Sequence, residues 1–111
     1  MNFAILNNNE RGYRVMKSKE LFEGLDVQFP PGLEEFGING ISVDSRNVQQ
    51  GNLFIAVPGH AQDGRKYIAE AVSLGARAIL TAPGKEINTG IPVITTAGLR
   101  EVISGIANRR W

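Results

Sequence analysis

The chain has 111 residues, of which 42% are hydrophobic and 21% charged, and its net charge is +1. This composition predicts one folded domain with a buried core, and it provides no long-range field that would attract nucleic acid or an anionic membrane. The sequence has no cysteine and one histidine, which excludes disulfides, cysteine nucleophiles and multi-histidine zinc sites. No apolar run reaches membrane-spanning length and no signal-peptide core is present, so we expect a cytoplasmic protein.

The start of the chain is rich in asparagine and shows no apolar period. We therefore expect residues 1–15 to be a flexible extension, either a true arm of the protein or a stretch ahead of a genuine start at Met16. Residues 16–111 are expected to form the folded domain. Within this domain, Ser18 is suited to cap a short helix that runs to Leu25.

A strand–turn–strand unit follows a loop of residues 26–40 that is rich in proline and glycine. Ile41–Val43 predicts a short strand. Three polar side chains come directly after it: Asp44, Ser45 and Arg46. A turn at Gly51 leads to Leu53–Val57, an apolar run that is too short for a helix and typical of a strand covered on both faces. Polar groups at the exit of a strand in an α/β sheet mark a usual place for a ligand.

The next loop, residues 58–65, is rich in glycine and hydrogen-bonding side chains and leads into a helix. Asp63 can cap this helix over Arg65–Leu74, and Gly75 ends it. The predicted buried side of the helix consists of Tyr67, Ile68, Ala71, Val72 and Leu74. The strand Ala76–Leu80 follows, and we expect it to pair in parallel with Leu53–Val57 through a right-handed crossover.

The last two predicted elements are a strand and an amphipathic helix. Ile91–Thr95 predicts the strand, and Pro92 favours its start or a sheet edge. The helix has apolar residues at i, i+3, i+4, i+7 and i+8, namely Leu99, Val102, Ile103, Ile106 and Ala107. Thr96 is its expected cap. Together the elements predict an α/β domain with a small mixed β-sheet flanked by helices.

Three short motifs have an ordinary structural interpretation beside a functional one. A phosphate-binding loop at Gly84-Lys85 would need glycine at position 79 and Ser or Thr at position 86, but Ile79 and Glu86 stand there, so Lys85 is expected to be a solvated lysine. The polar triplet of residues 44–46 could be a turn held by local side-chain bonds. Residues 58–65 could be a surface loop that only caps a helix. The glycines of that loop would equally let its amides approach an anion or a polar ring.

No catalytic set can be assembled from these residues. The chain has one histidine and no obvious pair of carboxylates, and its serines lack a nucleophile-elbow motif. The sequence therefore predicts a binding module rather than a self-contained enzyme.

The string VDSRNVQQGNLFIAVPGHAQDGRKYIAEAVSLGARAIL, residues 43–80, resembles the N-terminal domain of the Mur ligases. These are cytoplasmic ATP-dependent enzymes that build the peptidoglycan stem peptide. The resemblance extends from about residue 16 to the last helix. The Gly-His-x-x-Asp-Gly-Arg-x-Tyr-Ile pattern is most similar to the MurE type, the UDP-N-acetylmuramoyl-alanyl-glutamate–diaminopimelate or lysine ligase, which adds the third residue of the peptide. The MurF type has a similar pattern and is the alternative.

The resemblance implies a site for the UDP end of UDP-N-acetylmuramoyl-L-alanyl-D-glutamate. The implied contacts are Val43, Ser45, His60, Ala61 and Gln62, with Asp44, Arg46, Asp63 and Gly64 in support. The family frequently has His-Gln-Ala where this chain has His-Ala-Gln, so the side-chain roles of Ala61 and Gln62 depart from the pattern. Uracil presents two carbonyl acceptors and one N–H donor, which loop amides, a hydroxyl and an imidazole can match. Such a site orients the substrate and performs no chemistry.

Family members continue into a central ATP-binding domain and a C-terminal domain. The resemblance therefore implies no cofactor in this chain, with ATP and magnesium bound by the central domain. The implied partners are the peptide substrate and the remaining ligase domains, with no nucleic acid and no membrane. Two hypotheses lead: the substrate-binding domain of a MurE-type ligase, inactive alone, and a stand-alone non-enzymatic UDP-sugar-binding module. A small independent hydrolase or transferase ranks last for want of a catalytic set.

Overall fold

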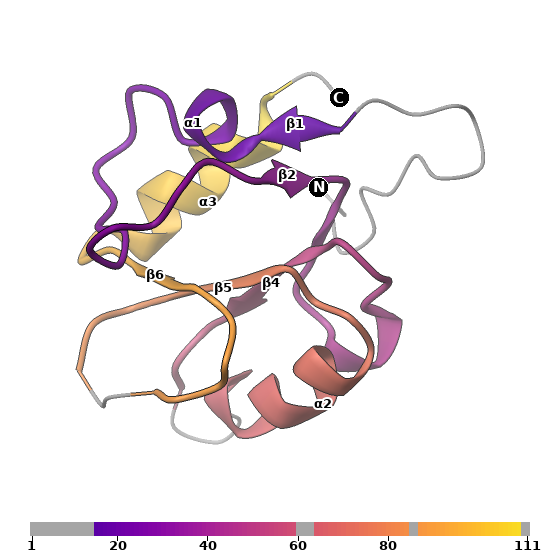
Figure 1. The fold of residues 1–111 in the computed structure, drawn as a ribbon. Coiled ribbons are helices and arrows are strands. Elements are labelled where there is room, and N and C mark those ends of the chain that lie inside the picture. The colour runs from indigo at the N-terminus through magenta and orange to yellow at the C-terminus, as the bar shows by residue number, and fades with distance from the viewer. Residues whose placement is uncertain (1–14, 60–63, 85–86, 110–111) are drawn as a thin grey trace.

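The computed structural model describes residues 15–59, 64–84 and 87–109 (Figure 1). The strands are β1 (Met16–Lys17), β2 (Gly37–Ile38), β3 (Ile41–Ser42), β4 (Leu53–Ala56), β5 (Ala78–Thr81) and β6 (Val93–Thr95). The helices are α1 (Ser18–Leu21), α2 (Ile68–Ser73) and α3 (Leu99–Ala107), with 3-10 turns η2 (Ser45–Asn47) and η3 (Gly64–Tyr67). Within the described ranges, no helix is long and apolar enough to cross a bilayer. The predicted extension, residues 1–15, lies almost entirely outside these ranges.

The main sheet consists of β3, β4, β5 and β6 in that order, and each neighbouring pair is parallel. Antiparallel pairing occurs in the small β1–β2 ladder and in a bridge between Gln28 and Thr95 at the β6 edge. The predicted α/β class, with a small mixed sheet flanked by helices, is therefore confirmed. The predicted parallel pairing of β4 with β5 is confirmed as well.

Strand β4 is buried along its whole length because both faces of the sheet are covered. Leu53 and Ile55 belong to the cluster that contains residues of α1 and α3. Phe54 and Ala56 belong to a second cluster, which contains residues of α2. Figure 1 shows the same layers, with α1 and α3 on one side of the sheet and α2 on the other. The apolar run was expected to form a strand covered on both faces, and this is confirmed.

Helix α3 has the predicted amphipathic pattern but a different cap. Val102 and Ile106 are buried in the first cluster, as the apolar spacing predicts. The N-cap is Gly98, which has no side chain to offer. The hydroxyl of Thr96 instead donates to the Asp26 carbonyl at 2.7 Å and accepts from the Gly98 amide at 3.0 Å. The prediction that Thr96 caps α3 was therefore wrong, because this hydroxyl ties the end of β6 to a distant loop.

Helix α1 is shorter than predicted. It ends at Leu21, although the sequence favours a helix to Leu25, because Gly24 has a φ of 78° and turns the chain out of the helical region. Ser18 is not its cap. The Ser18 hydroxyl is buried and accepts a hydrogen bond from the Phe36 amide at 3.1 Å, which joins the helix to the start of β2.

The helix that follows the 58–65 loop begins as η3 and becomes α2 at Ile68. The predicted burial is correct for three side chains, which are buried or half-buried: Ile68, Ala71 and Val72. It is wrong for Tyr67 and Leu74, which are 44% and 43% exposed. Both lie outside the regular α-helical residues, so the 3.6-residue period does not apply to them. Asp63, the predicted cap, lies outside the described residues.

Candidate functional site

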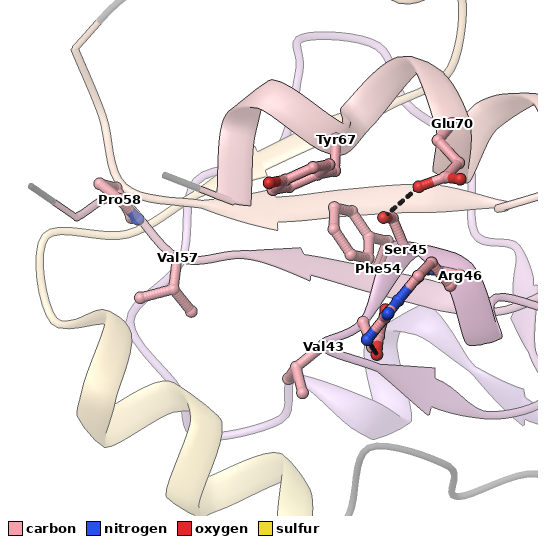
Figure 2. A pocket seen from close by; sticks show the side chains of 9 residues that line it. Val43, Ser45, Arg46, Phe54, Val57, Pro58, Tyr67 and Glu70 are labelled. Carbon is pink, nitrogen blue, oxygen red and sulfur yellow. Dashed lines mark hydrogen bonds and ion pairs between the residues drawn. The ribbon is translucent and has the colours of Figure 1, made fainter. Parts of the chain in front are cut away.

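The exits of β3 and β4 open onto a pocket of about 720 Å³ (Figure 2). Because these strands are parallel neighbours, the residues that follow them come together at one edge of the sheet. The turn η3 and helix α2 supply the opposite wall. The lining residues are Val43, Asp44, Ser45 and Arg46 after β3, Val57 and Pro58 after β4, Phe54 within β4, and Tyr67 and Glu70.

Asp44 organises the turn at the end of β3. Its Oδ1 accepts from the Arg46 amide at 2.9 Å, which is the N-cap bond of η2. The Arg46 side chain bonds the same carboxylate twice, Nε to Oδ1 at 3.1 Å and Nη2 to Oδ2 at 2.8 Å. The side-chain hydrogen bond with its partner lowers the pKa of Asp44 and raises the pKa of Arg46. The interpretation of residues 44–46 as a locally bonded turn is therefore confirmed, and the two charges offset each other at the pocket.

Ser45 contributes a largely buried hydroxyl, since the residue is 5% exposed. Its Oγ donates to Glu70 Oε1 at 2.5 Å, the dashed line in Figure 2. Hydroxyl-to-carboxylate bonds of this length are charge-assisted and about twice as strong as neutral ones. This bond joins η2 to α2, so the end of β3 and the helix hold each other in place across the pocket.

Apolar side chains form the rest of the wall. Val43, Val57 and Tyr67 are 42%, 45% and 44% exposed, and they are half of the large hydrophobic side chains exposed in the described residues. Phe54 lies behind them and is 1% exposed. An apolar wall beside a few fixed polar groups is the usual composition of a small-molecule site and suits a flat polar ring.

The structure brings part of the predicted site together. Four of the predicted residues line the pocket: Val43, Asp44, Ser45 and Arg46. Gly64 is the first residue of η3. The remaining predicted residues, His60, Ala61, Gln62 and Asp63, lie outside the described residues. Pro58 and Tyr67, which stand on either side of that stretch in the sequence, both line the pocket.

Five lining residues are not predicted from the sequence as site residues: Phe54, Val57, Pro58, Tyr67 and Glu70. A signal for two of them exists, because Tyr67 and Glu70 are three residues apart and such residues share a helix face. An aromatic ring and a carboxylate at this spacing, directly after a glycine-containing loop, indicate a site. Phe54 gives no such signal, since a buried strand residue has the same sequence pattern whether or not it borders a pocket.

A second and more open hollow of about 580 Å³ lies at the β6 edge of the sheet. Its described lining is the segments 28–30 and 87–93 together with Thr95, and none of these described residues is charged. It therefore offers fewer specific contacts to a nucleotide than the pocket at β3 and β4.

The described residues do not fit a magnesium or ATP site. They contain no group of three acidic or histidine side chains that could hold a metal ion. The Gly84-Lys85 pair lacks the flanking residues of a phosphate loop, and Lys85 lies outside the described residues. We derive no chemical step through ATP on this chain.

Comparison with protein families gives a match over most of the described chain. A family model described as "Mur ligase family, catalytic domain" matches residues 37–109. The matched range runs from β2 to the end of α3 and includes every residue that lines the pocket.

Several curated relatives share one name, UDP-N-acetylmuramoyl-L-alanyl-D-glutamate–2,6-diaminopimelate ligase. The protein of Rhizobium meliloti (strain 1021) is 37% identical over 87 residues, and that of Pseudomonas aeruginosa is 38% identical over 88 residues. These matches cover 78% and 77% of this chain and 18% of each relative. The chain thus spans less than a fifth of the length of these relatives.

Similar solved structures include MurF ligases. A crystal structure of MurF from Acinetobacter baumannii has a TM-score of 0.56 and 18% identity, and the match covers 96% of this chain and 21% of that one. This likeness supports the fold alone. The MurF ligase from Thermotoga maritima in complex with ADP has a TM-score of 0.52 and 28% identity, over 60% of this chain and 15% of that one.

Proposed function

The chain belongs to the Mur ligase family, and we propose that it is the domain of a MurE-type ligase that binds the UDP end of UDP-N-acetylmuramoyl-L-alanyl-D-glutamate. In this proposal the domain is the N-terminal part of a cytoplasmic enzyme that adds the third residue of the peptidoglycan stem peptide. The MurE type is favoured over the MurF type because the relatives at 37% and 38% identity carry the diaminopimelate-ligase name. ATP and magnesium would act on other domains of the ligase.

The observation that carries the proposal is the pocket at the exits of β3 and β4. Its volume of about 720 Å³ falls in the range usual for small-molecule sites, roughly 300–1,000 Å³. Val43, Val57 and Tyr67 offer apolar surface to the faces of a flat ring. Ser45 offers a fixed hydroxyl beside that surface. Uracil, with flat faces and a hydrogen-bonding edge, has the complementary chemistry.

Val43 and Ser45 are the proposed contacts within the described residues. His60, Ala61 and Gln62 are proposed as further contacts on the resemblance of the sequence alone, with support from Asp44, Arg46, Asp63 and Gly64. The task of such a site is to hold the nucleotide so that the distant peptide end of the substrate lies at the reacting centre. Binding energy from a non-reacting part of the substrate is thereby used for orientation.

Calorimetric titration of the chain with the UDP-N-acetylmuramoyl dipeptide, UDP and ATP in parallel tests this function. We expect the first two ligands to bind and ATP to give no heat of binding, and we expect no phosphate release from ATP. Binding of ATP without binding of either UDP ligand would refute the proposal. A coding sequence for an ATP-loop domain directly downstream would favour the ligase domain over a stand-alone UDP-sugar binder.

A further inference from the structure

The bond between Ser45 and Glu70 fixes more than the position of the serine hydroxyl. A hydroxyl has one hydrogen to donate and two lone pairs that accept. A carboxylate has only acceptor oxygens, so the 2.5 Å bond to Glu70 Oε1 uses the single hydrogen of Ser45 Oγ. What remains for a ligand at this atom is its lone pairs.

We propose that Glu70 is a positioning residue that makes Ser45 a hydrogen-bond acceptor toward the ligand, and thereby selects a base that donates at this point. The inference rests on the proposed function, since it concerns the same pocket. Glu70 and Ser45 both line this pocket, and Glu70 reaches it from α2 while Ser45 comes from the end of β3 (Figure 2). No pattern within either segment alone reveals the pairing, because the two residues are 25 positions apart.

The selected ligand class is a uracil nucleotide. The edge of uracil carries an imide N–H between two carbonyl oxygens, and this N–H can donate to the Ser45 oxygen. Cytosine has an unprotonated ring nitrogen at the same position, which would place lone pair against lone pair. A site that leaves buried polar groups unpaired rejects the wrong ligand strongly. Ser45 is 5% exposed, so water cannot readily replace the missing partner.

Removing Glu70 would free the hydroxyl to rotate. It could then donate to the cytosine nitrogen as easily as it accepts from the uracil N–H. A loss of Glu70 that merely loosened the fold would weaken both nucleotides alike. The ratio of the two dissociation constants therefore separates the positioning role from a structural one.

The test is calorimetric titration of the full chain with UDP and with CDP, for the wild type, Glu70→Ala, Ser45→Ala and the double variant. We expect the wild type to prefer UDP and Glu70→Ala to reduce the UDP-to-CDP preference by about five-fold or more, which is the effect of one mispaired hydrogen bond. Ser45→Ala should reduce the preference as well, and adding Glu70→Ala to it should change nothing further, because the two residues act through one contact. Glu101→Ala removes the same charge from an exposed position of α3 outside the pocket and should keep the wild-type preference.

An unchanged preference in Glu70→Ala, with UDP and CDP weakened equally or not at all, would overturn the inference and leave the proposed function standing. Failure of the wild type to bind UDP would overturn the proposed function, and the inference with it. If Glu70→Ala does not fold, Glu70→Leu carries the same test, since it fills much of the same space but has no acceptor for the hydroxyl hydrogen. The preference should then fall as well.

Discussion

Phe54 links the buried face of the sheet to the pocket, so shortening its side chain should affect both stability and binding. The residue is 1% exposed and belongs to the cluster with Ile68, Ala71 and Ile79. Phe54→Leu removes three ring carbons. At about 0.8 kcal/mol per buried carbon, the lost transfer free energy is about 2.4 kcal/mol. A cavity that remains adds to this cost and repacking lowers it, so we expect a loss of roughly 2–3 kcal/mol.

For a domain of this size, each kcal/mol lowers the thermal midpoint by about 4–8 °C, so we expect Phe54→Leu to unfold roughly 8–24 °C below the wild type. Circular dichroism melting at matched protein concentration measures this shift. Ile55→Val is the matched control, because Ile55 is the next residue of β4 and belongs to the opposite cluster. It should cost about 0.5–1.5 kcal/mol and leave UDP binding unchanged.

UDP affinity should fall in Phe54→Leu and remain unchanged in Ile55→Val, since Phe54 lines the pocket and Ile55 does not. A shift of the midpoint below about 2 °C in Phe54→Leu would show that this side chain is not packed as described. Equal loss of UDP binding in both variants would show that general loosening of the sheet, rather than the pocket wall, controls affinity.

Three further outcomes follow from particular contacts. Gly51→Ala should lower the free energy of unfolding in urea by roughly 1–3 kcal/mol, because Gly51 has a φ of 91° and a Cβ there would lie 2.5 Å from Asn39 Nδ2. Gly24→Ala should cost less, since Gly24 has a φ of 78° but nothing lies within 4 Å of its added Cβ. Equal costs for the two variants would refute the steric argument. Because the pKa of Asp44 is lowered, its ionised form stabilises the fold at pH values above the ordinary pKa of 3.8, and this contribution is lost as the pH falls through the lowered pKa. The difference in unfolding free energy between the wild type and Asp44→Asn should therefore shrink in acid. A difference that does not vary with pH would contradict this argument. A chain that starts at Met16 should keep the wild-type thermal midpoint, and a drop of several degrees would show that residues 1–15 contribute to the fold.

The elements that the sequence predicts well are those with a strong local pattern. The unbroken apolar run of β4 reflects burial on both faces of the sheet. The i, i+3, i+4 spacing of α3 reflects burial of one face of this helix in the first cluster. The location of the pocket could also be predicted, because polar residues after a strand come together with the exit of its parallel neighbour. Val43 and Ser45 both line the pocket at this edge of the sheet, and their contact with a ligand stays a prediction.

The errors arise where a polar side chain serves a distant partner. Ser18 and Thr96 both fit the local pattern of a helix cap, but their hydroxyls bond residues 18 and 70 positions away. Glu70 is another such case, since its role depends on a serine 25 positions earlier. Propensity and periodicity describe neighbours along the chain, so contacts of this kind become visible only once the fold is known.

The central claim is that UDP binds at the exits of β3 and β4, and nuclear magnetic resonance mapping of UDP on the labelled chain tests it most directly. We predict concentration-dependent shifts of the backbone amides of residues 43–46 and 67–70, with residues 28–30 and 87–93 unchanged. Shifts confined to residues 28–30 and 87–93 would place the nucleotide in the hollow at the β6 edge and contradict the account. The absence of any shift at millimolar UDP would contradict it as well.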